Sequence, residues 1–494
     1  MNQCNGKVIL VGAGPGDPGL LTLAGAQAIA GADAIVYDAL APSATLRHAR
    51  PGVELHYVGK RSGAHARQQT EINALLVDLA SAGKRVVRLK GGDPFLFGRG
   101  AEEALACREG GIPFEVIPGI SSALAAPAFA GIPLTHRQMA GDVLIVTGHE
   151  AGDAPSTDWA FAAQASTLVI VMGAASLAEN MASLRAAGKP PGTPVACVRW
   201  GTRPDQQVVT GTVESIAGEV SRAGLTAPLA TVVGPVAAFA HDLTWFEPGP
   251  LAGHRIVVTR ARSDLSELAA RLEALGAFIT EAPAISIRPS GSKADLAAAV
   301  LERPDWIVFT SRHAVRAVIR SLRVYDSDVR SLSGIKLAAI GTATAEVLES
   351  TGIRPDFTPT RGTSEVLAAE LPIQPGDRAL LPLSTSSDNR LEALLAHRGA
   401  VLSRVTAYEN VAEPLAEYQR SEVLEANIIT FTSASTATNL RAALGDAPLS
   451  EGAKLVSIGP RTSEAVLRAF GRVDAQASTP SIEALIQAVL EVAT

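Results

Sequence analysis

The stretch VGAGPGDPGLLTLAGAQAI, residues 11–29, predicts a strand, a glycine turn and a helix in direct succession. Gly14, Gly16 and Gly19 satisfy the pattern GxGxxG, and Asp38 ends the next predicted strand. In dinucleotide-binding folds such glycines approach a pyrophosphate, and an acid in that position binds a ribose hydroxyl. The pattern therefore predicts an α/β domain, and an NAD(P) site is one interpretation of it.

Two residues of the turn weigh against NAD(P). Pro15 removes an amide that would donate to pyrophosphate, and Asp17 would bring a carboxylate close to that dianion. A tight structural turn without a ligand remains an alternative at this point.

Two further loops follow predicted strands. In RLKGGDPFLFGRG (88–100), Gly91 and Gly92 permit close backbone approach to a ligand and Asp93 adds a polar group. The stretch IPGISS (117–122) offers small residues where a helix begins. Three such loops in sequence order predict a nucleoside-like ligand across the carboxyl edge of a sheet.

The composition excludes several classes of protein. The chain has 494 residues, 47% of them hydrophobic and 19% charged, which predicts several folded domains and argues against disorder. Aromatic residues are only 4% and the net charge is −6, so we expect no nucleic-acid partner. Short strand-like runs alternate with helical stretches throughout, and this alternation predicts mostly parallel sheets.

The patterns of cysteine, histidine and apolar residues bear on disulfides, metal sites and cellular location. The three cysteines form no CxxC pair and the histidines no HExxH, so we expect neither disulfides nor a metal site. We also expect no membrane segment and no cleaved leader, and hence a cytoplasmic protein. Between residues 47 and 99, ten basic residues face four acidic ones, a local excess that would attract a polyanionic small molecule.

The second half of the chain repeats itself. DWIVFTSRHAV (305–315) is similar to NIITFTSASTA (427–437), and KLAAIGTATAEVLESTGI (336–353) to KLVSIGPRTSEAVLRAFG (454–471). We therefore predict two copies of one α/β unit, at 254–371 and 377–490, with a ligand cleft between them. Prolines and glycines in FEPGPLAG predict a linker at 247–253, between domains 1–246 and 254–494.

The first half resembles the uroporphyrinogen-III C-methyltransferases, which use S-adenosylmethionine, over residues 6–246. The stretches that carry the resemblance occur in family order: VGAGPGDPGLLTL, ADAIVYD, VGKRSG, RVVRLKGGDPFLFGRG, VIPGISSALAAPAFAGIPLTHR, VMG and WGTRPDQ. The resemblance implies the two-lobed tetrapyrrole methylase fold, with cofactor and substrate between the lobes. It makes Asp38 the proton acceptor and Lys60 the proton donor. It places these residues around the cofactor: Pro15, Gly91, Gly92, Asp93, Leu96, Ser121, Ser122, Met172 and Gly201.

The second half resembles uroporphyrinogen-III synthase over residues 252–490, a fold of paired flavodoxin-like α/β lobes. The matching motifs are IVVTRA, DWIVFTS, IGTATAEVL, the pair Tyr408-Glu409, IITFTS and IGPRT. The resemblance implies that Tyr408 assists departure of a hydroxyl group without any cofactor. Hydroxyl groups at strand ends and helix starts would hold substrate carboxylates: Thr259, Ser311, Thr344, Ser433 and Thr462.

Together the two resemblances imply a bifunctional enzyme. It would cyclise hydroxymethylbilane to uroporphyrinogen III with inversion of ring D, and then methylate the product at C2 and C7 to give precorrin-2 for sirohaem or cobalamin. The family implies a homodimer formed through the methyltransferase half. The alternatives are an NAD(P)-dependent oxidoreductase on the N-terminal half and a non-catalytic tetrapyrrole-binding protein.

Overall fold

The structure, a computed structural model, describes residues 6–50, 52–59, 68–148, 157–259, 266–282, 285–289, 293–385, 387–412 and 414–493. The chain divides into two compact units. One comprises residues 1–256 with 271–280 and 493, and the other 257–270 with 281–492 and 494. Four five-stranded sheets with flanking helices confirm the predicted α/β class. No helix among the described residues is both long and apolar enough to cross a membrane.

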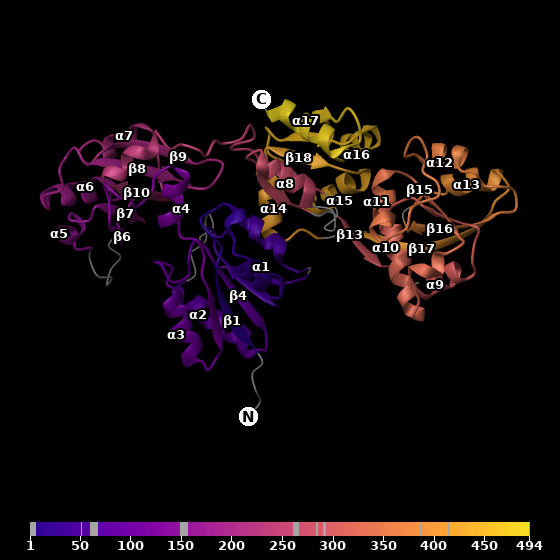
Figure 1. Cartoon of the computed structure of the whole chain (residues 1–494), viewed down its shortest axis with the longest axis horizontal. Coiled ribbons are helices and arrows are strands. Elements are labelled where there is room, and N and C mark those ends of the chain that lie inside the picture. Colours follow the sequence, from indigo (N-terminus) through magenta and orange to yellow (C-terminus); the bar gives the residue numbers. More distant parts are fainter. Residues whose placement is uncertain are drawn as a thin grey trace. The chain divides into compact units, whose positions relative to one another are not determined.

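The first lobe of the N-terminal half is built on a fully parallel sheet in the order β3-β2-β4-β1-β5. Its strands are β1 (Lys7–Gly12), β2 (Ala34–Tyr37), β3 (Glu54–Tyr57), β4 (Arg85–Lys90) and β5 (Phe114–Ile117). Its helices are η1 (Pro18–Leu20), α1 (Leu23–Ala30), η2 (Ser43–His48), α2 (Gln69–Ser81), α3 (Gly100–Glu109) and α4 (Ser122–Phe129). Helices α2 and α3 cover one face of the sheet and α1 covers the other (Figure 1).

Alternation along the strands decides which side chains meet which helix. Val8, Leu10, Val36 and Val86 form one core cluster with residues of α2 and α3, including Leu76. All four strand residues have even numbers. Alternate residues of a strand point to opposite faces, and the register of β1, β2 and β4 pairs even-numbered residues with one another. The later even-numbered residues of β4 therefore also face α3.

The loops after β1 and β4 define a switch point in this sheet. The connection from β1 to β2 passes β4 and the connection from β4 to β5 passes β1, with α1 on one face of the sheet and α3 on the other. Ligands of open α/β sheets bind at such points. Two glycines bridge the two loops, since the Gly14 amide donates to the Gly92 carbonyl at 3.3 Å and the Gly92 amide to the Gly14 carbonyl at 2.7 Å.

The second lobe departs from the expected parallel arrangement. Its sheet contains β6 (Val143–Thr147), β7 (Thr167–Val171), β10 (Leu229–Val233), β8 (Pro194–Arg199) and β9 (Gln207–Thr212), in that spatial order. Only β6 and β7 pair in parallel, and the other three pairs are antiparallel. The short loop between β8 and β9 allows a hairpin, whereas a parallel pair needs a long crossover. The associated helices are α5 (Trp159–Ala162), α6 (Leu177–Ala186), α7 (Ile216–Arg222) and η3 (Pro235–Ala240).

The C-terminal half contains two more sheets. The first has the order β12-β11-β18-β19-β20, from Phe278–Glu281, Arg255–Val258, Ile428–Phe431, Lys454–Ser457 and Ala475–Gln476. The second has the order β13-β17-β16-β14-β15, from Ile285–Pro289, Val401–Ala412, Arg378–Ser384, Trp306–Phe309 and Lys336–Ala339. The helices of this half are α8 (Ser266–Ala274), α9 (Lys293–Leu301), α10 (Arg312–Leu322), η5 (Arg323–Tyr325), η6 (Val329–Leu332), α11 (Thr342–Ser350), α12 (Ser364–Glu370), α13 (Arg390–His397), α14 (Glu417–Leu424), α15 (Ala434–Leu444), α16 (Pro460–Phe470) and α17 (Ile482–Ala493).

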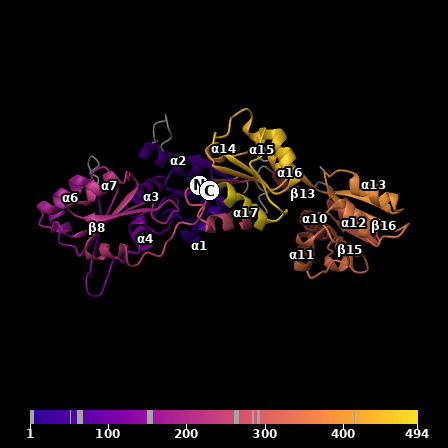
Figure 2. The ribbon, with the colours of Figure 1, turned by 90° about the horizontal axis from the view of Figure 1, so that it is seen from above.

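The sequence repeats appear as equivalent elements, but each sheet takes strands from both copies. The repeated motifs form β14 and β15 in one sheet and β18 and β19 in the other, and both pairs are parallel. Strand β11 of the first copy joins β18 of the second, while β16 of the second joins β14 of the first. The chain crosses to the other sheet after β12 and returns after β17. Helices α12 and α13 and helices α14–α16 accordingly gather round different sheets (Figures 1 and 2).

Candidate active sites

Asp38 lies directly after β2, at the carboxyl edge of the first sheet. Its side chain is 25% exposed, and its Oδ2 accepts a hydrogen bond from Nη2 of Arg88 at 2.9 Å. Its Oδ1 accepts from the amide of Leu40 at 3.1 Å. The carboxylate is therefore fixed on both oxygens while part of it still faces solvent. Lys60, the predicted proton donor, lies outside the described residues.

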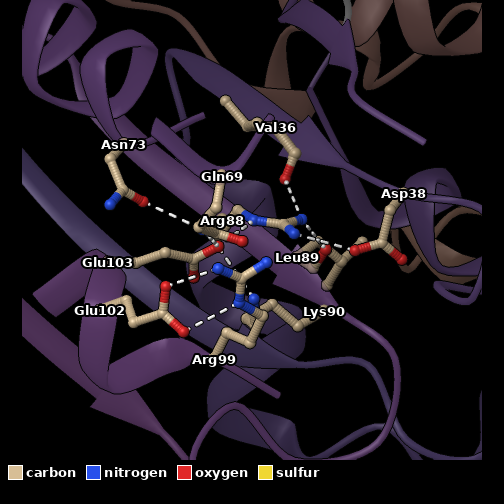
Figure 3. Close-up of polar contacts among 10 residues, drawn as sticks. All are labelled: Val36, Asp38, Gln69, Asn73, Arg88, Leu89, Lys90, Arg99, Glu102 and Glu103. Atoms are coloured by element: carbon tan, nitrogen blue, oxygen red, sulfur yellow. Dashed lines mark hydrogen bonds and ion pairs between the residues drawn. The ribbon is translucent and has the colours of Figure 1, made fainter. Parts of the chain in front are cut away.

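A buried network of charges lies behind Asp38 (Figure 3). Arg88 and Lys90 project from β4 towards α3, where the fully buried carboxylate of Glu103 accepts from both. Arg88 Nε lies 3.0 Å and Lys90 Nζ 2.9 Å from Glu103 Oε1. Burial lowers the pKa of Lys90, and the charge of Arg88 lowers it further, while Glu103 partly offsets both.

Glu103 and its role were missed by the sequence analysis, which counted Arg88 and Lys90 only as part of a basic segment. A detectable pattern exists, because two cations at alternate positions of an apolar strand require a buried counter-charge. The partner was not identifiable from sequence spacing alone, since α3 has two adjacent glutamates. Glu102 pairs with Arg99 instead.

Several of the described basic residues between 47 and 99 form ion pairs. Arg50 pairs with Asp33 and Lys84 with Glu54. Arg88 and Lys90 also have acidic partners, while Lys60, Arg61 and Arg67 of this segment lie outside the described residues.

The first-lobe residues predicted to surround a cofactor come together at the switch point. Pro15 lies in the loop after β1, Gly91 and Gly92 lie after β4, and Ser121 begins α4 after β5. A Cβ on Gly91 would lie 2.6 Å from the Cβ of Leu40, so this position requires glycine.

Asp93 holds two of these loops together. Its carboxylate accepts from the amides of Phe95 at 2.8 Å, Leu96 at 3.1 Å and Gly119 at 3.0 Å. Ser121, the first of the predicted pair, accepts from the Ala123 amide as the N-cap of α4, and Ser122 is the first residue of that helix.

The second lobe contributes the loop after β8. A Cβ on Gly201 would lie 2.3 Å from the Cβ of Ala126, so glycine permits this loop to pack against α4. The next residue, Thr202, accepts at Oγ1 from the Asp17 amide at 3.1 Å, which joins this loop to the first glycine turn. Met172 follows β7 and is 55% exposed.

Backbone strain is concentrated in these loops. Seven non-glycine residues of the described chain have a clearly positive φ, and five belong to the loops after β4, β7 and β8: Phe97, Arg99, Met172, Trp200 and Thr202. Left-handed backbone at non-glycine residues is often retained where a ligand binds. Among the described residues, no group of three His, Cys, Asp or Glu side chains could hold a metal ion.

In the C-terminal half, the predicted residues are divided between the two sheets. Ser311, Thr344 and Tyr408 belong to elements of the β14 sheet, and Thr259, Ser433 and Thr462 to elements of the β18 sheet. Ser311 and Ser433 occupy equivalent N-cap positions on α10 and α15. Thr344 and Thr462 are buried in the first turns of α11 and α16.

Tyr408 contacts one of these predicted hydroxyl groups. Its phenolic oxygen lies 3.0 Å from Ser311 Oγ, and its ring lies 5.7 Å from the imidazole of His313, centroid to centroid. Thr259, in contrast, is fully buried and donates its Oγ1 hydrogen to the carbonyl of Thr430 at 2.7 Å. Its hydroxyl stabilises the junction of β11 and β18.

Two protein families match the two halves of the chain. The family of Tetrapyrrole (Corrin/Porphyrin) Methylases matches residues 7–217, and the family Uroporphyrinogen-III synthase HemD matches residues 266–487. The "Porphyrin biosynthesis protein HemD" of Ruminiclostridium josui is 35% identical over 99% of this chain and 98% of that protein. The "Uroporphyrinogen-III C-methyltransferase" of Bacillus subtilis is 41% identical over 71% of this chain and 74% of that protein.

A solved uroporphyrin-III C-methyl transferase from Thermus thermophilus, complexed with S-adenyl homocysteine, is 38% identical. It covers 47% of this chain and 99% of its own, with a TM-score of 0.42. The family matches and the full-length relative confirm both resemblances found in the sequence and do not favour an oxidoreductase or a non-catalytic binding protein. The chain therefore belongs to the tetrapyrrole methylases through its N-terminal half and to the uroporphyrinogen-III synthases through its C-terminal half, as a bifunctional enzyme of tetrapyrrole biosynthesis.

Proposed function

We propose that the N-terminal domain, residues 1–246, methylates uroporphyrinogen III at C2 and C7 to give precorrin-2, with S-adenosylmethionine as the methyl donor. The observation that carries this proposal is the position of Asp38, a partly exposed carboxylate beside the switch point where the glycine loops meet. A small-residue cradle and an adjacent proton acceptor are what methylation of a pyrrole carbon requires.

The residues at the switch point fit this cofactor. Gly92 leaves its backbone open to close approach, since a Cβ there would meet no atom nearer than 3.8 Å, and the start of α4 offers amide donors to polar groups. The cofactor would lie among Pro15, Gly91, Gly92, Asp93, Leu96, Ser121, Ser122, Met172 and Gly201. When bound, it supplies a methyl group that its sulfonium has already activated.

Proton movement falls to the chain's own side chains. Asp38 would accept the proton that the substrate loses after each methylation, since Arg88 holds Oδ2 and leaves the carboxylate edge partly exposed. Lys60 would donate a proton to the tetrapyrrole. Positioning of donor and acceptor can supply about 7–11 kcal/mol of the barrier reduction, so accurate placement is the main demand on the fold.

We further propose that the C-terminal domain, residues 254–494 beyond a linker at 247–253, cyclises hydroxymethylbilane to uroporphyrinogen III with inversion of ring D, without a cofactor. Tyr408 would assist departure of the hydroxyl group, and the contact with Ser311 would orient its phenol. The hydroxyls of Ser311, Thr344, Ser433 and Thr462 would hold carboxylates, each contributing modestly. Thr259, predicted as a fifth such residue, is fully buried and donates its hydroxyl hydrogen to Thr430, so its role is to hold β11 against β18.

The setting of the two activities completes the proposal. The cyclised product of one domain is the methyl acceptor of the other, so the chain would supply the sirohaem or cobalamin branch with precorrin-2. Cysteines without a pairing pattern support a cytoplasmic location. The family resemblance supports a homodimer through the N-terminal domain, which light scattering would reveal as twice the chain mass.

Two separate assays test the two halves. Purified chain and hydroxymethylbilane should yield the type III isomer of uroporphyrinogen, separated chromatographically from the type I isomer that forms spontaneously. Purified chain, uroporphyrinogen III and methyl-labelled S-adenosylmethionine should yield a product that carries two labels. A type I product, or an unlabelled type III product, would contradict the corresponding half of the proposal.

A further inference from the structure

The guanidinium of Arg88 is fixed at each of its three nitrogens (Figure 3). Nη2 donates to Asp38 Oδ2 at 2.9 Å, and Nε donates to Glu103 Oε1 at 3.0 Å. Nη1 donates to the carbonyl of Leu89 at 2.9 Å and reaches that of Val36 at 3.4 Å. A planar group held in this way presents one edge to Asp38 in a single orientation.

Glu103 is itself held by groups from two elements. Its Oε1 accepts from Arg88, from Lys90 Nζ at 2.9 Å and from Gln69 Nε2 at 3.2 Å. Gln69, at the start of α2, also donates to Asn73 Oδ1 at 2.9 Å. The other oxygen, Oε2, is buried and has no hydrogen-bond partner among the described residues.

A purely stabilising role explains this cluster poorly. Replacing buried ion pairs by apolar residues of similar volume is often neutral or stabilising, because removing charges from water is costly. Here two cations share one oxygen of Glu103, and a fourth charged group, Asp38, lies partly in solvent. The arrangement is explained if its role is to orient the carboxylate of Asp38.

Resting on the proposed methylation, we infer that Glu103 is a positioning residue: it orients Arg88, which in turn holds the Asp38 carboxylate towards the substrate. Glu103 also steadies the end of β4 through Lys90, whose carbonyl accepts from the Ala13 amide at 2.7 Å. One buried carboxylate on α3 thus links the proton acceptor to the strand that carries the glycine loop.

The test is steady-state methylation of uroporphyrinogen III by Glu103→Gln, with Glu109→Gln as the matched control. Glu109 lies on the same helix and is exposed. We expect kcat of Glu103→Gln to fall about 10- to 100-fold. KM for S-adenosylmethionine and the affinity for S-adenosylhomocysteine should change less than about threefold, since the residue touches neither. The control should keep its wild-type kcat.

A double-mutant cycle separates positioning from general loss of structure. In an Asp38→Asn background, Glu103→Gln should reduce kcat by no more than about twofold further, because the residue it orients is already lost. Losses that multiply would overturn the inference. Arg88→Lys provides a second route if Glu103→Gln folds poorly, since it keeps the charge but cannot contact both carboxylates, and the same non-additivity is expected.

The outcomes also distinguish this inference from the proposed function. A wild-type chain that binds S-adenosylhomocysteine but does not methylate uroporphyrinogen III refutes the proposed function, and the inference with it. A methylating wild type together with a folded Glu103→Gln whose kcat is unchanged refutes the inference alone.

Discussion

The two halves of the chain organise their polar groups in opposite ways. In the N-terminal half, Asp38, Arg88 and Glu103 form one continuous chain of contacts at the edge of a single sheet. In the C-terminal half, Ser311 and Ser433 occupy equivalent helix starts on two different sheets. Methylation, which depends on one proton acceptor, should fall steeply when any residue of this chain of contacts is replaced. Substrate binding in the C-terminal half, which depends on many weak donors, should weaken only slightly with each substitution.

The largest effect should follow the loss of the proton acceptor. Asp38→Asn should lower methylation about 10²- to 10⁴-fold, the usual contribution of a general base. Affinity for S-adenosylhomocysteine, measured by calorimetry, should stay close to wild type because the glycine loops are unchanged. Unchanged methylation would remove Asp38 from its proposed role and end the contrast between the two halves.

The next effect concerns stability. Glu103→Ala leaves Arg88 and Lys90 buried beside an empty position and should cost about 3–5 kcal/mol of unfolding free energy. Glu109→Ala on the same helix should change it by less than about 0.5 kcal/mol. Denaturant unfolding followed by a probe in the N-terminal half measures both. Equal losses of unfolding free energy in Glu103→Ala and Glu109→Ala would mean that water reaches the network around Glu103 and that its charges are not buried.

A smaller effect is expected in the C-terminal half. Tyr408→Phe removes the phenolic hydroxyl and its contact with Ser311. Formation of uroporphyrinogen III should fall up to about tenfold, the scale of one hydrogen bond. The rate of type III isomer formation is the readout. A complete loss would show that catalysis in this half also depends on one group.

The smallest effects should come from the two equivalent helix caps. Ser311→Ala and Ser433→Ala should each cost about 1 kcal/mol of stability through the lost N-cap. Each should raise KM for hydroxymethylbilane about two- to fivefold, the size expected of a single donor near a helix start. Only Ser311→Ala should also lower kcat, because only Ser311 contacts Tyr408. Equal kcat values would remove that contact from the mechanism.

The sequence predicted local features better than distant partners. The strand, turn and helix of residues 11–29 depend on neighbouring residues, and the predicted loops at Gly91 and Ser121 lie at one sheet edge. The ion pair between Glu103 and Arg88 joins α3 to β4 across a helix–sheet interface, and no sequence spacing specifies such a pair. Predicting this pair would also have required a choice between the adjacent residues Glu102 and Glu103.

The repeats illustrate the same limit at the scale of whole sheets. The similarity of the segments around Ser311 and Ser433 correctly indicated equivalent strand–helix units. It could not indicate that β11 pairs with β18 and β16 with β14, because strand pairing depends on which edges the crossing chain can reach. Each of the two sheets therefore contains strands from both copies of the sequence repeat.

A coupled reaction tests whether both halves of the chain act in sequence. Purified chain is incubated with hydroxymethylbilane and methyl-labelled S-adenosylmethionine, and the tetrapyrrole products are separated by isomer type. We expect a type III product with two labelled methyl groups from the wild-type chain, and unlabelled uroporphyrinogen III from Asp38→Asn. A wild-type chain that leaves the type III product unlabelled would refute the proposed methylation.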